Sequence, residues 1–108
     1  MNDERAVFVY TTHPSLVEAE RTAKAVLEKR LAACVNILQP CRSIYRWEGA
    51  IETASEVPAL FKTTLEVADR IIGRITELHS YSNPALVIWP ITKLPFAYAD
   101  WVEENISG

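Results

Sequence analysis

Two periodicities of apolar residues alternate along this chain and predict its secondary structure. Apolar residues at every second position, or in a short β-branched run, indicate a strand, whereas apolar residues every three to four positions indicate a helix. Strands are therefore expected over 6–12, 31–38, 41–47 and 86–89, further extended chain from 51 and over 56–63, and helices over 16–30, 64–79 and 96–105.

The helix starts are marked by capping boxes, in which a Ser or Thr N-cap is followed three residues later by Glu. Ser15 and Glu18 have this spacing before the first helix, and Thr63 and Glu66 before the second. The charged residues of the first helix, Glu18 among them, mostly fall off its apolar stripe. We therefore expect them to form a solvated face.

The segment 43–49 is rich in polar, charged and aromatic residues, and it is expected to form one arm of a long central hairpin. In a strand, Ser43, Tyr45 and Trp47 share one face, because successive side chains point to opposite faces. Gly49 then provides a place to turn before the next extended run.

Two prolines mark irregularities in the extended segments. Gln39-Pro40 predicts a bend before the hairpin, and Pro58 predicts an edge or a bulge, because proline donates no hydrogen bond to a ladder. The order β-α-β, hairpin, β-α-β is that of a ferredoxin-like α+β fold. Helices on one face of such a sheet leave its other face bare, so apolar residues there would need a partner subunit.

Composition limits the classes of function. A chain of 108 residues suits a single domain, and a net charge of −3 argues against nucleic acid as a partner. Apolar runs fall short of the roughly 18–20 residues that span a membrane, and the acidic N-terminus is unlike a signal peptide. Cys34 and Cys41 form no disulfide framework, so we expect free thiols in the cytoplasm.

Several motifs, taken together, resemble the signature of the CutA divalent-cation-tolerance family. The resemblance spans nearly the whole chain with little or no shift in spacing, and the set is highly specific although no single motif is. The motifs are Glu28-Lys29-Arg30-Leu31-Ala32-Ala33-Cys34-Val35-Asn36-Ile37, Ser43-Ile44-Tyr45-Arg46-Trp47-Glu48-Gly49, Ile51-Glu52, Glu56-Val57, Lys62-Thr63, Leu78-His79-x-Tyr81, Trp89-Pro90 and Tyr98-x-x-Trp101.

The resemblance implies a ferredoxin-like subunit in a tight homotrimer similar to the PII signalling proteins. It also implies a cytoplasmic protein linked to copper and other divalent metals, with no established catalytic reaction and no required cofactor. The chain departs from the family pattern at Ser82 and Ala85, where the family has carboxylates that could help to bind a hard cation. His13 replaces a frequent family cysteine, which exchanges one borderline-soft ligand for another.

The candidate metal ligands are Cys34, His13, Cys41 and His79. Thiolates and imidazoles suit Cu and Zn, and the two thiols would meet if the Gln39-Pro40 bend brought them together. Three of these residues also have a plain alternative. Cys34 is expected to pack as a small buried hydrophobe, His13 to be a solvent-facing histidine at a strand end, and His79 to complement a helix C-terminus.

The candidate cleft residues are Trp47, Lys62, Tyr81 and Tyr45, which the resemblance places near clefts between subunits. The aromatic residues could instead pack the trimer interface, which is the commoner use of large aromatic side chains. Lys62 ends an apolar strand, where it would either extend to solvent or fix an anion.

Three functions are compatible with these features. The first is a non-enzymatic homotrimer that binds divalent metal and affects metal tolerance. The second is a PII-like signalling or scaffold trimer whose ligand, bound between subunits, biases a loop that a protein partner recognises. The third, an acylphosphatase-like hydrolase, ranks last because the loop 11–15 has neither the arginine nor the glycines that an anion-binding loop needs.

Overall fold

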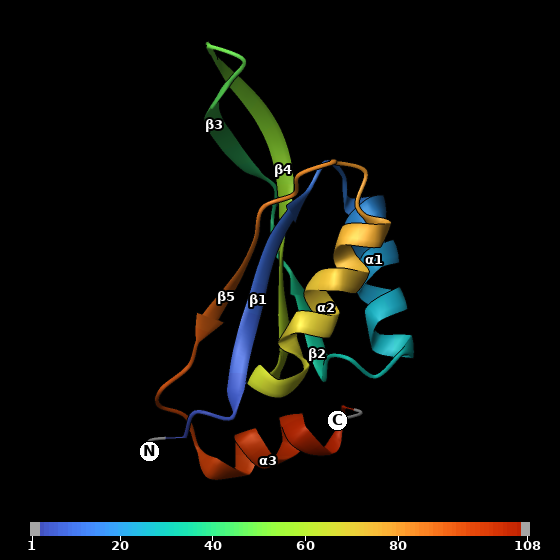
Figure 1. Cartoon of the computed structure of the whole chain (residues 1–108), viewed down its shortest axis with the longest axis vertical. Coiled ribbons are helices and arrows are strands. Elements are labelled where there is room, and N and C mark those ends of the chain that lie inside the picture. Colours follow the sequence, from blue (N-terminus) through green and yellow to red (C-terminus); the bar gives the residue numbers. More distant parts are fainter. Residues whose placement is uncertain (1–2, 107–108) are drawn as a thin grey trace.

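Two helices, α1 (Leu16–Glu28) and α2 (Leu65–Leu78), cover one face of an antiparallel sheet (Figure 1). The structure is a computed structural model and describes residues 3–106. The strands are β1 (Ala6–His13), β2 (Cys34–Ile37), β3 (Cys41–Trp47), β4 (Ala50–Thr64) and β5 (Leu86–Pro90).

The strand order is β2–β4–β1–β5, and β3 pairs with the far part of β4. The β3–β4 hairpin projects from one end of the molecule, and α3 (Phe96–Glu104) lies across the other (Figure 1). The predicted ferredoxin-like α+β fold with a long hairpin and a C-terminal helix is thus confirmed. The homotrimer stays a prediction.

The main core lies between the sheet and the two covering helices. Alternate residues of β1 and β4 point into it, because a strand presents every second side chain to the same face. Val9 and Phe61 from the strands, with Ile71 and Ile75 from α2, are completely buried there. The opposite face of the sheet, here called the open face, is free of α1 and α2 (Figure 1), and α3 packs against its end at Ala6.

A single long strand, β4, links the core to the hairpin. Its 15 residues join the two extended segments that the sequence predicted separately. The hairpin turns through Glu48 and Gly49, which have φ angles of 49° and 81°, between the paired residues Trp47 and Ala50. Positive φ at both turn residues matches the right-handed twist of the strands, and glycine adopts it without strain.

Pro58 lies inside β4, which is paired with β1 at this point, so the prediction of an edge or a bulge is wrong for that side. On the other side, β2 ends opposite Ala59 and β3 begins opposite Glu56, which leaves a gap beside Pro58. The Pro58 carbonyl accepts a bond from Leu38 N–H on this side. The missing N–H would point the same way, towards Leu38 just beyond the end of β2, so proline costs at most one bond at the end of that ladder.

Of the two predicted capping boxes, the first forms only its N-cap hydrogen bond and the second does not form. Ser15 is the N-cap of α1, and its hydroxyl accepts a hydrogen bond from Glu18 N–H. The N-cap of α2 is Thr64 rather than Thr63, because the Thr63 hydroxyl instead donates to the Leu31 carbonyl at 2.7 Å. No helix within residues 3–106 is long and apolar enough to cross a membrane.

Candidate functional site

The two candidate cysteines lie far apart in the subunit. Cys34 pairs with Lys62 and Cys41 with Glu56, six positions away along the same strand. At about 3.3 Å per residue, this separates them by roughly 20 Å. Both thiols are free and partly buried. Within the part of the chain that the structure describes, no three His, Cys, Asp or Glu side chains are placed to hold a metal ion.

The two candidate histidines, in contrast, are brought together. The rings of His13 and His79 stack with centroids 5.0 Å apart and an angle of 15° between their planes. His79 Nε2 lies 2.7 Å from the Thr12 carbonyl, and its Nδ1 accepts a hydrogen bond from Tyr81 N–H. Both ring nitrogens are thus engaged by backbone groups, with Nε2 donating to the Thr12 carbonyl and Nδ1 accepting from Tyr81 N–H.

His13 is completely buried, so the expectation of a solvent-facing side chain is wrong. The alternation of β1 explains this, because His13 continues the helix-facing row of Val7, Val9 and Thr11. Neither ring nitrogen makes a hydrogen bond to another described residue, although a backbone group of Val57 lies near. Burial, and then the adjacent His79, lower the pKa of His13.

Glu18 completes this cluster and was missed by the sequence analysis, which placed it on a solvated face. It is only 6% exposed, and its Oε2 lies 3.6 Å from His79 Nδ1 and accepts a hydrogen bond from Ser80 N–H. Helical spacing could have revealed it. Glu18, Thr22 and Val26 are four residues apart and all buried, so they share the core-facing side of α1.

Tyr81 lies at the base of the hairpin, beside this cluster. Its ring is 5.0 Å from that of His79. Partial burial, and then the carboxylate of Glu56, raise the pKa of the Tyr81 phenol. Of the candidate residues, His13, His79 and Tyr81 are therefore neighbours in one subunit.

Among the other cleft candidates, Trp47 and Lys62 lie far apart in the subunit. Trp47 pairs with Ala50 at the tip of the hairpin, and Lys62 lies twelve positions further along β4. That distance is about 40 Å in an extended strand. Tyr45 pairs with Glu52, also in the outer part of the hairpin. Trp47 and Lys62 can therefore meet only if they come from different subunits.

Lys62 stands among aromatic residues on the open face. The cross-strand pairs place Cys34, Lys62, Phe8 and Trp89 in one row. Lys62 Nζ lies 5.4 Å from the Phe8 ring centre, and Trp89 stacks on Tyr10. Among residues 3–106, no carboxylate lies within 4.0 Å of Lys62 Nζ. The open face thus presents, among the described residues, a cation without a carboxylate partner and the exposed ring of Trp89.

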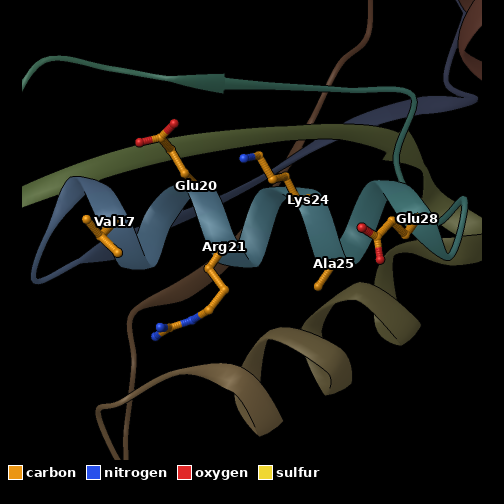
Figure 2. Close-up of a pocket in the computed structure, with 6 residues that line it drawn as sticks. All are labelled: Val17, Glu20, Arg21, Lys24, Ala25 and Glu28. Atoms are coloured by element: carbon orange, nitrogen blue, oxygen red, sulfur yellow. The ribbon is translucent and has the colours of Figure 1, made fainter.

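Two surface hollows lie elsewhere. A groove of about 520 Å³ follows the outside of α1 and contains none of the candidate residues. Figure 2 shows its side chains leaving one helix in different directions instead of converging. A second hollow of about 290 Å³ lies beside the Gln39-Pro40 bend. Neither collects groups that could hold a metal, so the open face and the hairpin remain the better candidates.

Comparison with known proteins agrees with this architecture. Residues 7–105 match the family model described as CutA1 divalent ion tolerance protein. The divalent-cation tolerance protein CutA of Archaeoglobus fulgidus is 43% identical over 100 residues, which are 93% of this chain and 97% of the relative. The corresponding protein of Thermus thermophilus is 42% identical over 97 residues, which cover 90% and 94% of the two chains.

Solved structures agree with the same assignment. A structure named periplasmic divalent cation tolerance protein CutA, from Archaeoglobus fulgidus, superposes with a TM-score of 0.91 at 42% identity, covering 94% of this chain and 99% of the other. CutA from Synechococcus elongatus superposes with a TM-score of 0.93 at 34% identity, covering 99% and 95%. Sequence, fold and family model therefore agree that the chain belongs to the CutA1 divalent ion tolerance protein family.

Proposed function

We propose that this CutA-family protein is a non-enzymatic homotrimer that binds a divalent cation, with copper as the first candidate, in clefts between its subunits. It would contribute to the tolerance of metal ions that its relatives are named for. Free thiols favour a reducing compartment, so the cytoplasm is the proposed location, although the Archaeoglobus fulgidus structure is named periplasmic.

The observation that carries the proposal is the exposure of the outer hairpin. Ile44 and Ile51 lie on one face and Tyr45 and Trp47 on the other, and all four are at least 41% exposed. A two-stranded hairpin with apolar residues on both faces is marginal by itself. Contacts with other subunits on both faces would bury these side chains, as in a closed homo-oligomer.

The same assembly would supply metal ligands that one subunit lacks. Cys34 lies on the open face, in the same row as Lys62. The hairpin face that carries Tyr45 and Trp47 also carries Cys41, Glu52 and Glu56. A hairpin laid across the open face of a neighbour would bring a thiol and carboxylates towards Cys34, a mixed ligand set that suits Cu or Zn.

His13 and His79 are not part of this proposed ligand set. His79 uses both ring nitrogens for backbone groups, and His13 is enclosed in the core. Both are better explained by the local structure that they support.

Calorimetric titration of the reduced protein with Cu(II) and Zn(II), combined with light scattering, tests the proposal. We expect a trimer that binds metal stoichiometrically, and a loss of at least about tenfold in copper affinity for Cys34→Ser. Ser55→Ala, an exposed substitution on the hairpin, is the matched control. An unchanged titration for Cys34→Ser would remove Cys34 from the site, and a trimer without binding would remove metal from the function.

The alternative is a PII-like signalling or scaffold trimer that binds a small ligand between subunits. The Lys62 ammonium, which has no carboxylate partner within residues 3–106, favours it, because a cation covered by a neighbouring subunit needs a counter-charge. This alternative predicts a protein partner in pull-down experiments, whose recovery Trp47→Ala weakens. Repeated failure to find such a partner would count against it.

A further inference from the structure

The loop 80–85, which connects α2 to β5, is held at its first two residues by buried side chains. Ser80 N–H donates to Glu18 Oε2 at 3.4 Å, and Tyr81 N–H donates to His79 Nδ1 at 3.1 Å. Glu18 comes from the first turn of α1, and His79 directly follows α2. Two separate helices thus fix the point at which the chain leaves the core for the loop.

The burial of Glu18 is not explained by helix capping. In a complete capping box its carboxylate would turn back to the Ser15 N–H, whereas here it faces Ser80 and His79. An ionised carboxylate that is 6% exposed is costly unless it is paired or hydrogen-bonded. Its nearest cation, the Arg21 guanidinium, lies 3.9 Å away on a side chain that is 66% exposed. The contact with the loop is therefore a main reason for its inward orientation.

The anchored loop determines where Tyr81 lies. Tyr81 is bonded through its backbone to His79, and its ring leans on the same imidazole. The phenol is thereby held near Glu56, at the base of the hairpin. A loop free at residue 80 would let this ring leave the hairpin base.

We propose that Glu18 is a positioning residue that, together with His79, anchors the loop 80–85 and aims Tyr81 at the base of the hairpin. The inference deepens the proposed function and rests on it, because Tyr81 is a candidate residue of the cleft between subunits. Glu18 itself touches no ligand in this account and acts through the loop.

Hydrogen exchange of the metal-free protein tests the anchor. For Glu18→Ala we expect the Ser80 and Tyr81 amides to exchange about tenfold faster, the change for losing one charge-assisted hydrogen bond. Amides of β1 and the inner part of β4 should keep their rates. Glu18→Gln retains an acceptor oxygen of the same reach and should restore most of the protection.

Glu20→Ala is the matched control, because it removes the same charge from an exposed position of the same helix. Unchanged loop exchange in Glu18→Ala would overturn the proposal, as would an equal rise throughout the core or a failure of Glu18→Gln to restore protection. Exchange is measured without metal, so it tests the anchor independently of metal binding. A wild-type protein that binds no copper would count against the proposed function, and the exchange rates would still test the role of Glu18.

Discussion

The two halves of β4 follow the same alternating pattern but have opposite environments. In the inner half, residues 57–64, the strand pairs with β1 and β2, and Phe61 is completely buried under the helices. In the outer half, residues 50–56, β4 pairs with β3 alone, and Ile51 is 69% exposed. None of the helices within residues 3–106 reaches the outer half (Figure 1).

This contrast shows that the formation of a strand and the burial of its side chains have different requirements. Alternation of apolar and polar residues is sufficient to pair β3 with β4, whereas burial requires a second layer. The inner half has that layer within the subunit. The outer half offers apolar side chains on both faces, which is the property expected of a segment completed by another chain.

The largest expected effect is in the inner half. Phe61→Ala would leave a cavity under α1 and α2, because Phe61 is one of the largest fully buried side chains. We expect the free energy of unfolding to fall by about 3–5 kcal/mol, measured by denaturant titration at fixed protein concentration. A loss below about 1 kcal/mol would mean that the inner half is not the stable part of the molecule.

Substitutions in the outer half should affect the assembly of subunits more than the folding of each subunit. Ile51→Asp would place a charge in the expected interface, at a cost of about 1–3 kcal/mol per subunit, and light scattering should show a mass shifted from trimer towards monomer. Val17→Asp on α1 is the matched control, since Val17 is 70% exposed and Ile51 69%. If both variants assemble like the wild type, the outer hairpin is not the interface.

The elements of both halves could be predicted because their signals are local. The periods of apolar residues located the helices and strands, and the Glu48-Gly49 pair located the turn. The predictions were wrong where a side chain bonds to a residue that is distant in the sequence. Thr63 bonds the Leu31 carbonyl instead of capping α2, and no local pattern records that contact.

The candidate site was harder to predict for the same reason. The stacking of His13 on His79 depends on how the end of β1 meets the end of α2, which lie far apart in the sequence. The separation of Trp47 from Lys62 follows only once β4 is known to be one extended strand. Whether these two residues share a cleft depends on a neighbouring subunit, which a single chain does not specify.

A smaller effect is expected from removing the unsatisfied histidine of the core. His13→Phe keeps a ring to stack on His79 and removes two buried nitrogens that lack hydrogen bonds within residues 3–106. We expect the free energy of unfolding at pH 7 to rise by about 1 kcal/mol. A decrease would show that the His13 nitrogens are satisfied in solution.

The difference in the free energy of unfolding between His13→Phe and the wild type should increase in mild acid. The pKa of His13 is lowered in the folded protein, so the unfolded chain takes up the proton first as the pH falls below its ordinary value of about 6.5. The wild type therefore loses stability below that pH until the folded pKa is passed, after which the loss is constant. Unfolding curves between pH 8 and 5 should diverge for the two proteins, and parallel curves would contradict the assignment.

The smallest effect is expected at Pro58, where the two halves of β4 meet. Proline at this point restricts the unfolded chain and removes at most the one bond opposite Leu38, because its nitrogen faces the end of β2. Pro58→Ala should therefore lower the free energy of unfolding by only about 0.4–1 kcal/mol, mainly through the entropy of the unfolded state. Light scattering should show an unchanged mass of the assembly.

Ala59→Pro is the informative contrast to Pro58→Ala. Ala59 is paired on both sides, with Thr11 in β1 and with Ile37 in β2. A proline at this position should cost about 3 kcal/mol or more in the free energy of unfolding, because the neighbouring strand would lose a bonding partner. If both substitutions change the free energy of unfolding by the same amount, the gap beside Pro58 is not what allows a proline in the middle of the sheet.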